Sequence, residues 1–125
     1  EFTQEDLSKM VVGKGGFVAY LGTNDALEIK NKIKAGDEEA DFYDSAMAYQ
    51  IAKEIGAAST VLKGDVDGIL LTGGLAYGKH FVEKITSRVK HLGAVYSFPG
   101  EDEMNALAFN VLLMLKGEIP LKNYE

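Results

Sequence analysis

A pair of glycines at the end of an apolar run is the feature of this sequence best suited to chemistry. The apolar run is Val66 to Leu71, Thr72-Gly73-Gly74 ends it, and an amphipathic helical pattern follows. Ligands of open α/β sheets bind beyond the carboxyl ends of the strands. Glycines there let the backbone approach a ligand closely, because they carry no Cβ, and the free N–H groups of the next helix suit a phosphate. The alternative is a plain turn that needs a positive φ, and spacing alone leaves it open.

Two polar segments and one glycine-rich segment are further candidates. Gly22-Thr23-Asn24-Asp25 predicts a helix start, with Asp25 and Glu28 in a capping arrangement. Glu101-Asp102-Glu103 opens the last predicted helix, where acidic residues offset the helix macrodipole. Gly13-Lys14-Gly15-Gly16 lacks both the Lys-Ser/Thr end of a P-loop and the third glycine of the dinucleotide fingerprint, so we interpret it as a turn. His80 and His91 have no metal-ligand spacing and are expected at the surface.

Composition excludes several classes of protein. The 125 residues are enough for one domain with a core, and 46% hydrophobic with 26% charged residues is ordinary for a soluble protein. The net charge is −6 without a basic stripe, which argues against nucleic acid and anionic membranes as partners. The absence of cysteine excludes disulfides, thiolate zinc sites and cysteine nucleophiles. Without a signal peptide or an apolar run long enough to span a bilayer, a cytoplasmic protein is the default expectation.

The elements that must position these residues follow from hydrophobic periodicity. A first helix is capped by Thr3 and Asp6 and ends at Gly13, and a short strand is predicted at 17–21 on residue type. A second helix runs from Asp25 to Gly36 with Ile29 buried and Leu27 exposed. The longest helix covers 37–62, and its small residues, which allow close approach of another element, are Ala48, Ala52, Gly56 and Ala57.

The second half of the chain predicts a parallel strand pair. Strand 66–71, a helix ending near His91 and strand 94–98 imply a right-handed crossover. Phe81, Val82, Ile85 and Val89 form the buried stripe of that helix. The last helix begins at Glu101; its predicted core face is Met104, Leu107, Ala108, Val111, Leu112 and Leu115, with Phe109, Leu113 and Met114 on the other side.

Two strands are too few for a complete sheet. The chain also begins Glu1-Phe2-Thr3, without an initiator methionine. We therefore expect the later part of a larger α/β domain.

Five segments together resemble the acetate and butyrate kinase family, which has the actin-like ATPase fold. They are Val12 to Gly16, Tyr20 to Asp25, Ala46 to Ala57, Leu71 to Tyr77 and Pro99 to Met104, and they keep their order and spacing between Val12 and Leu115. The resemblance implies that residues 1–125 are the C-terminal part of an actin-like ATPase (ribonuclease H-like) nucleotide-binding domain, with two parallel strands and surrounding helices and no second domain.

The resemblance also implies site residues. Gly73 and Gly74 match the nucleotide-binding glycine turn of the family, flanked by Thr72, Leu75 and Ala76. Thr23, Asn24 and Asp25 match a segment that lines the adenosine pocket, although Asp25 as a simple helix cap stays an alternative. Leu27 stands where the family usually has arginine, which removes a cation from this part of the site. Glu101, Asp102 and Glu103 match an acidic segment that helps to hold Mg²⁺, with macrodipole compensation as the alternative.

The implied function is ATP-dependent phosphorylation of butyrate or a similar short-chain fatty acid to an acyl phosphate, with Mg²⁺ as a cofactor. This chain would supply part of the nucleotide site, the carboxylate would bind mainly outside it, and no catalytic residue is assigned within it. The chain alone is expected to be inactive, and the intact enzyme to be a homo-oligomer. The alternative is a non-enzymatic nucleotide-binding or assembly module of the same fold, and the apolar surplus of the last helix indicates assembly.

Overall fold

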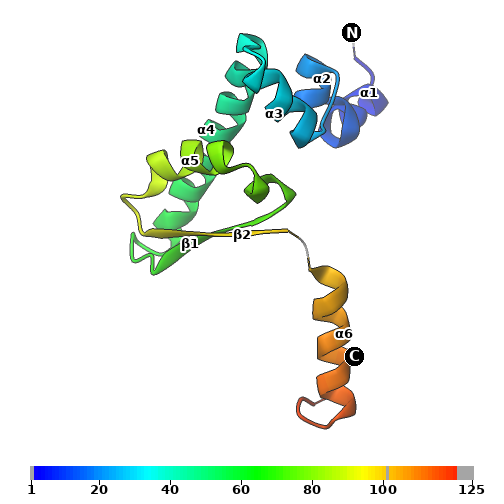
Figure 1. Cartoon of the computed structure of the whole chain (residues 1–125), viewed down its shortest axis with the longest axis vertical. Coiled ribbons are helices and arrows are strands. Elements are labelled where there is room, and N and C mark those ends of the chain that lie inside the picture. The colour runs from blue at the N-terminus through cyan, green and yellow to red at the C-terminus, as the bar shows by residue number, and fades with distance from the viewer. Residues whose placement is uncertain (1, 101, 121–125) are drawn as a thin grey trace.

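The computed structural model describes residues 2–100 and 102–120 of the chain (Figure 1). Its helices are α1 (Gln4–Lys9), α2 (Phe17–Leu21), α3 (Ala26–Lys34), α4 (Glu38–Val61), α5 (Lys79–Val89) and α6 (Glu103–Leu115). Its strands are β1 (Gly68–Gly73) and β2 (Ala94–Pro99). A π-helical segment, Met10–Lys14, follows α1, and a 3-10 helix, Gly74–Tyr77, follows β1.

The two strands form a parallel sheet, as the strand–helix–strand order predicted. Their register pairs Gly68 with Ala94 at one end and Gly73 with Pro99 at the other, and α5 makes the crossover between them. β1 begins two residues later than predicted and includes Thr72 and Gly73. The glycine pair therefore straddles the end of the strand, with Gly73 inside it and Gly74 beyond it.

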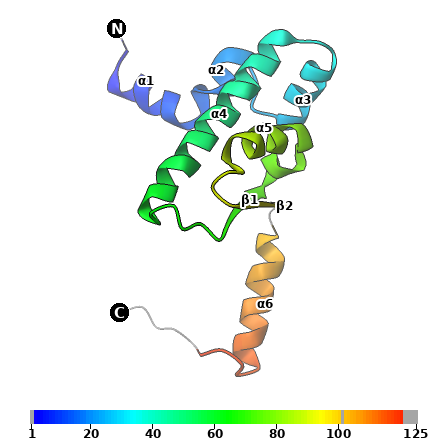
Figure 2. The same cartoon turned by 90° about the vertical axis from the view of Figure 1, so that its left-hand side faces the viewer.

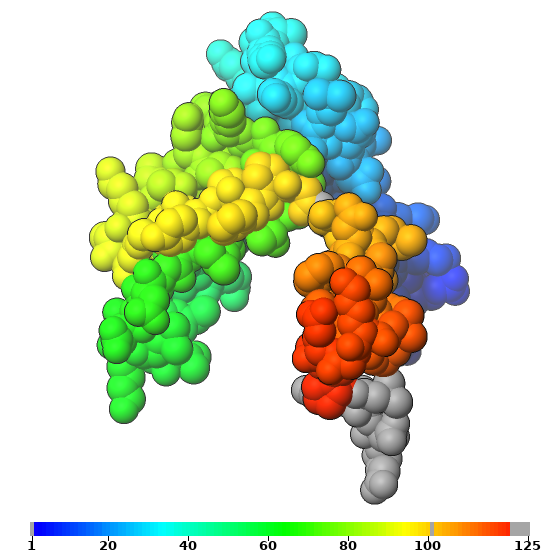
Figure 3. Space-filling view, turned by 60° about the horizontal axis from the view of Figure 1, so that its bottom comes forward, coloured from blue at the N-terminus to red at the C-terminus, as the bar shows by residue number. Residues whose placement is uncertain are grey.

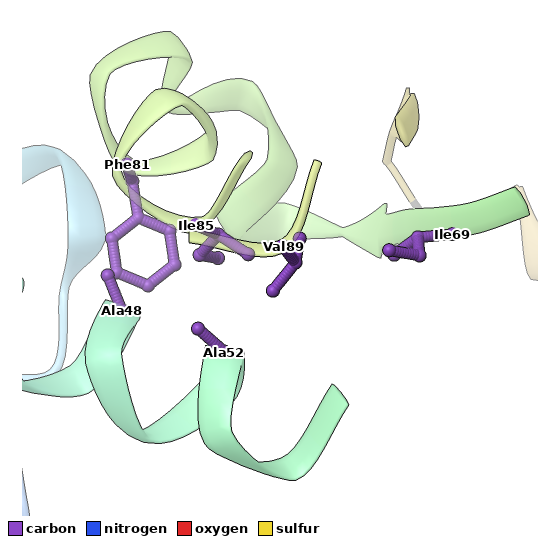
Figure 4. Close-up of a cluster of buried hydrophobic side chains, with 6 residues drawn as sticks. All are labelled: Ala48, Ala52, Ile69, Phe81, Ile85 and Val89. Carbon is purple, nitrogen blue, oxygen red and sulfur yellow. The ribbon is translucent and has the colours of Figure 1, made fainter. Parts of the chain in front are cut away.

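The core lies where α5 packs on α4 and on one face of β1. Figure 4 shows Phe81, Ile85 and Val89 of α5 pointing toward Ala48 and Ala52 of α4, with Ile69 of β1 beside them. These six side chains are buried, and the larger residues of α4 pack at the edge of the cluster. The prediction that the small residues of α4 admit a close neighbour is confirmed for Ala48 and Ala52, whereas Gly56 and Ala57 lie outside the buried cluster.

Local capping signals set the helix starts as predicted. The Thr3 hydroxyl accepts a hydrogen bond from the Asp6 N–H, and the Asp6 carboxylate accepts one from the Thr3 N–H, which completes a capping box. The Thr3 hydroxyl also donates a 2.7 Å hydrogen bond to the Asp6 carboxylate, and this bond, together with the one from the Thr3 N–H, holds the pKa of Asp6 below its ordinary value. Asp25 and Asp37 cap α3 and α4 by accepting hydrogen bonds from backbone N–H groups of the first turn. Glu28, which was predicted to share the cap of α3, pairs with Lys32 instead.

The strand predicted at 17–21 is wrong, since these residues form α2. No neighbouring strand is available in the described structure to pair with the segment, so an extended backbone would find no partner within the described protein for its N–H and C=O groups. The helix satisfies them locally, and Gly22 ends it with φ 71°, donating its N–H to the carbonyl of Val18. Residue type alone did not carry this information.

Helix α6 projects away from the rest of the chain in both ribbon views and is joined only at the end of β2 (Figures 1 and 2). The space-filling view shows the same separation (Figure 3). None of its residues is buried, so the predicted core face is wrong for this chain. Leu113 and Met114, predicted on the opposite side, are the better covered residues of the helix. No described element lies against α6 that could bury its apolar residues.

The face of the sheet opposite α4 and α5 is also uncovered. Leu70 of β1 and Tyr96 and Phe98 of β2 are each more than half exposed. Thr72 lies beside Phe98 in the register on this same face. The described residues therefore present two apolar surfaces, the open sheet face (Leu70, Tyr96 and Phe98) and α6.

Within residues 2–100 and 102–120, no helix combines the length and the apolar character that crossing a membrane requires.

Candidate functional site

A cavity of about 430 Å³ opens beside the carboxyl end of β1. Its walls come from α3, from the 3-10 helix that follows β1, and from the start of α5, with single residues of α2 and α4. Its lining residues are Phe17, Ala26, Leu27, Ile29, Lys30, Ile33, Lys34, Asp44, Gly74, Leu75, Tyr77, Gly78, His80 and Phe81. This is the edge of the sheet where the sequence predicted a ligand.

The two glycines of the predicted turn have different structural roles. Gly73 has φ 83° and ψ −177°, a combination open essentially to glycine alone. Gly74 has no such restriction; it lines the cavity, and a Cβ placed on it would meet no atom within 4 Å. The backbone conformation at position 73 therefore requires glycine, whereas at position 74 the missing side chain leaves open space at the cavity wall.

The residues that flank the glycines divide between the cavity and the fold. Leu75 lines the cavity. Ala76 is buried, and Thr72 lies on the open sheet face. Of the five residues predicted here, Gly74 and Leu75 thus border the cavity. Thr72, Gly73 and Ala76 do not line it and form the adjoining parts of β1 and the 3-10 helix.

The expectation that a helix begins directly after the glycine pair needs correction. The short 3-10 helix comes first, and α5 begins only at Lys79. The N–H of Gly78 closes the 3-10 turn on the carbonyl of Leu75 at 3.0 Å. The 3-10 helix therefore separates Gly74 from the free N–H groups at the start of α5, and the N-cap residue of α5 is Gly78.

Thr23, Asn24 and Asp25 form the entry to α3 and do not themselves line the cavity. The Asp25 carboxylate accepts hydrogen bonds from the N–H groups of Leu27 at 2.8 Å and Glu28 at 3.3 Å. The Thr23 hydroxyl accepts one from the Asp25 N–H at 3.1 Å. This cap fixes the first turn of α3, which places Leu27 at the cavity wall. The capping role predicted for Asp25 is confirmed.

An ion-pair network supports the floor of the cavity. Asp44 is buried, lines the cavity and accepts a 2.6 Å hydrogen bond from Lys84 Nζ, which also donates to Asp41 at 2.7 Å. The bond from Lys84 holds the pKa of Asp41 below its ordinary range. Burial of Lys84 acts to lower its pKa, but the bonds to the two carboxylates outweigh this and raise it. The single positive charge of Lys84 is thus shared between Asp44, which lines the cavity, and Asp41.

The acidic segment 101–103 comes directly after Gly100 in the chain. Gly73 and Gly100 exchange two backbone hydrogen bonds, so the glycine turn lies beside the residue that precedes this segment. Glu101 lies outside the described residues. Asp102 and Glu103 are exposed, and the Asp102 carboxylate accepts a 2.6 Å hydrogen bond from the Asn105 amide.

Among the described residues, no three acidic, histidine or cysteine side chains group together in a way that could hold a metal ion. His80 and His91 are exposed, as predicted. His80 nevertheless lines the cavity and lies 3.9 Å from Asp41.

Sequence reasoning missed most of the cavity wall. Phe17, Asp44 and Tyr77 come from elements whose meeting cannot be read from local patterns. Lys30 and Lys34 were detectable in principle, because they follow Leu27 at helical spacing on the same helix face. Leu27 is exposed, as predicted, and it borders the cavity together with Ile33 of the same helix.

Comparison with known proteins gives a consistent match over nearly the whole chain. The model of the acetokinase family matches residues 1–109. The chain is 50% identical over 124 residues to a "probable butyrate kinase 2" of Caldanaerobacter subterraneus subsp. tengcongensis, covering 99% of this chain and 35% of that protein. It is 46% identical over its full length to "butyrate kinase 2" of Clostridium acetobutylicum and 44% identical to a "probable butyrate kinase" of Bacteroides thetaiotaomicron. In each case, the chain spans 35% of the relative's length.

Proposed function

Because this chain belongs to the acetokinase family, a family of the actin-like ATPase fold, we propose that it is part of an ATP-dependent butyrate kinase. The whole enzyme would transfer the γ-phosphoryl group of ATP to the carboxylate of butyrate or a similar short-chain fatty acid, giving an acyl phosphate and ADP. The single observation that carries the proposal is the cavity beside Gly74, at the carboxyl end of β1.

The chemistry of the cavity suits a nucleoside. Its volume lies within the range of small-ligand pockets. Apolar side chains from α3 and α5 offer contact to a base, and an open glycine at the wall allows the backbone to approach a ribose or a phosphate. Butyrate, which has only four carbons, would use little of this volume, so the carboxylate substrate is assigned to parts of the enzyme outside this chain.

The sequence-derived site residues take graded roles in this proposal. Gly74 and Leu75 contact the nucleotide, and Thr72, Gly73 and Ala76 hold the turn that presents them. Thr23, Asn24 and Asp25 hold the first turn of α3 against the adenosine. We assign these roles from the positions of the residues around the cavity.

Mg²⁺ is a proposed cofactor, and the acidic segment supplies the appropriate donor atoms. Carboxylate oxygens suit this hard cation, which commonly takes only one or two protein ligands and completes its shell with water and phosphate. Asp102 and Glu103 are exposed and accessible for this role, and Glu101 is the third candidate. When bound, Mg²⁺ would neutralise charge on the transferred phosphoryl group.

Phosphoryl transfer in this chemistry depends on positioning and charge neutralisation rather than on covalent catalysis. This chain therefore contributes nucleotide binding, whereas alignment of the nucleotide with the carboxylate requires the rest of the enzyme. The proposed location is the cytoplasm, where ATP is available. A coupled assay with ATP, Mg²⁺ and butyrate should give no turnover with the chain alone. Turnover should appear when the chain is part of a protein of the relatives' full length, and robust turnover by the isolated chain would contradict this division of roles.

A second candidate function is a non-enzymatic assembly module of the same fold. The observation in its favour is the pair of exposed apolar surfaces, the open sheet face and α6, because exposed apolar patches commonly mark interaction sites. Titration of the chain with a fluorescent ATP analogue separates the two functions. Saturable binding that unlabelled ATP displaces supports the kinase, whereas absence of binding in an associated, folded chain favours the module.

A further inference from the structure

Asp44 of α4 differs from the other ionisable residues that line the cavity. It is the one buried polar or charged residue of the described chain, with 8% of its surface exposed. The other ionisable residues of the lining are all exposed; they are Lys30, Lys34, Tyr77 and His80. Burial of a carboxylate costs free energy unless the group is paired and hydrogen-bonded. The position of Asp44 in a mostly apolar wall therefore needs a specific reason.

Attachment of α5 to α4 does not by itself require Asp44. Lys84 Nζ donates to Asp41 at 2.7 Å as well as to Asp44 at 2.6 Å, so the lysine keeps a carboxylate partner on α4 even without Asp44. One ammonium group shared by two carboxylates leaves an excess of negative charge. Asp41 is half exposed, so water stabilises its charge, whereas Asp44 is buried beside the cavity. Asp44 therefore favours a hydrogen-bond donor as its neighbour in the cavity and disfavours a phosphate.

One oxygen of the Asp44 carboxylate has no hydrogen-bond partner in the described part of the chain. Oδ2 accepts the bond from Lys84, and none of the described residues donates to Oδ1. Every side-chain oxygen or nitrogen that is sealed from solvent in residues 2–100 and 102–120 does have a partner, so Oδ1 is not sealed. An acceptor atom of a buried residue thus keeps access to solvent, and that residue lines a cavity.

We propose that Asp44 Oδ1 faces the cavity and accepts a hydrogen bond from the nucleoside part of the ligand. The inference rests on the proposed function in that it takes a nucleotide to be the ligand. The donor is the exocyclic amine of the base or a hydroxyl of the ribose, since an ionised carboxylate is an acceptor only. Apolar walls hold a base without fixing its orientation, and a few polar groups supply that specificity. Asp44 is thus a specificity-determining residue, and it keeps the nucleoside rather than the phosphates against this wall.

The test titrates the whole chain calorimetrically with ATP and with three analogues that each lack one donor. Purine riboside triphosphate lacks the exocyclic amine, and 2′-deoxy-ATP and 3′-deoxy-ATP each lack one ribose hydroxyl. The variant Asp44→Leu keeps the branched shape of the side chain and removes the acceptor. The matched control is Asp41→Leu, which makes the same change at the other carboxylate partner of Lys84, outside the cavity lining. Circular dichroism melting checks that both variants fold, and Asp44→Asn replaces Asp44→Leu if the leucine variant does not.

We expect the parent chain and the control to bind ATP about tenfold more tightly than one of the analogues, which identifies the donor. The preference should vanish in Asp44→Leu and shrink in Asp44→Asn, because the donor then loses its charged acceptor. Equal affinity of the parent chain for ATP and all three analogues would overturn the proposal and leave the nucleotide function standing. A preference that persists in the Asp44 variant, or is lost equally in the control, would do the same. Absence of ATP binding by the parent chain would refute the proposed function itself.

Discussion

Gly73 and Gly100 join the carboxyl ends of the two strands through a pair of backbone hydrogen bonds, 3.3 Å from the Gly73 N–H and 3.1 Å from the Gly100 N–H. The hydroxyl end of Tyr77, which lines the cavity, lies against Gly100, so that a Cβ there would be 2.7 Å from the Tyr77 hydroxyl oxygen. Gly100 also has φ 104°. Gly100 thus contacts both the glycine turn, through Gly73, and the cavity wall, through Tyr77.

The substitution Gly100→Ala should lower the free energy of unfolding by about 1–2 kcal/mol, because a side chain disfavours this backbone conformation. Urea denaturation measures the effect. Adding Tyr77→Phe should recover little, since the tyrosine can move aside and the backbone strain cannot. The control is Gly56→Ala in α4, where a Cβ meets nothing and stability should stay the same or rise. An unchanged free energy of unfolding in the Gly100→Ala protein would contradict the backbone strain expected at this position.

The two glycines of the turn should respond differently to a side chain. Gly73→Ala should destabilise the fold by about 1–3 kcal/mol, because φ 83° with ψ −177° is open essentially to glycine. Gly74→Val should melt at the parent temperature but bind ATP about tenfold more weakly, since its side chain would occupy the cavity. Melting and ATP titration of both variants check this. Equal losses of stability in both would mean that Gly74, too, only forms the turn.

The Lys84 network should contribute to stability across the neutral pH range. Lys84→Met leaves Asp44 buried without a partner and should cost about 3 kcal/mol at pH 7. Asp41→Asn is the control; because Asp41 is half exposed, its loss should cost under about 1 kcal/mol. Denaturation curves at several pH values measure both.

The pH dependence follows from the directions of the two pKa shifts. The lowered pKa of Asp41 makes its contribution complete above pH 3.8 and lost as the pH falls through the folded value. The raised pKa of Lys84 makes its contribution complete below pH 10.5 and lost as the pH rises through the folded value. The parent chain and Lys84→Met should therefore differ most between these limits. A difference that persists undiminished well below pH 3.8 would exclude the ion pairs as its source.

Self-association of the chain is predicted from its uncovered apolar surfaces. Leu107→Glu on α6 should give a folded monomer if α6 forms the contact, and Phe98→Glu should do so if the open sheet face forms it, because an unpaired charge opposes burial. Leu113, which the sequence placed on the exposed side of α6, is half-buried and is therefore a poor test position. Light scattering over a dilution series distinguishes the cases, with Val61→Glu at an exposed site of α4 as control. A parent chain that is monomeric at every concentration would exclude both contacts.

The sequence predicted those features that depend on local chemistry. Asp25 and Asp37 cap helices through their own side chains, so the sequence alone predicts these caps. Phe81, Ile85 and Val89 repeat at helical spacing, so the sequence alone also predicts the buried face of α5. The parallel strand pair followed from the order of strand and helix. The glycine turn was found because a strand end followed by two glycines is a local signal.

The parts that failed depend on neighbours. Residues 17–21 are apolar enough for a strand, yet the helix forms because no strand lies beside them in the described structure. The apolar residues of α6 read as a core face, but burial needs an opposing surface that the described chain does not provide. Lys30 and Asp44 share a cavity although separate helices carry them, and periodicity describes one helix at a time.

The location of the core between α4, β1 and α5 has a consequence for amide hydrogen exchange. The buried cluster draws only on residues 48–89, and α6 contributes nothing to it. Backbone amides of α5 and β1 should therefore open only with global unfolding and exchange most slowly. The amides of α6, whose hydrogen bonds lie in an exposed helix, should exchange orders of magnitude faster, and a binding partner that covers α6 would reveal itself as a local slowing of that exchange.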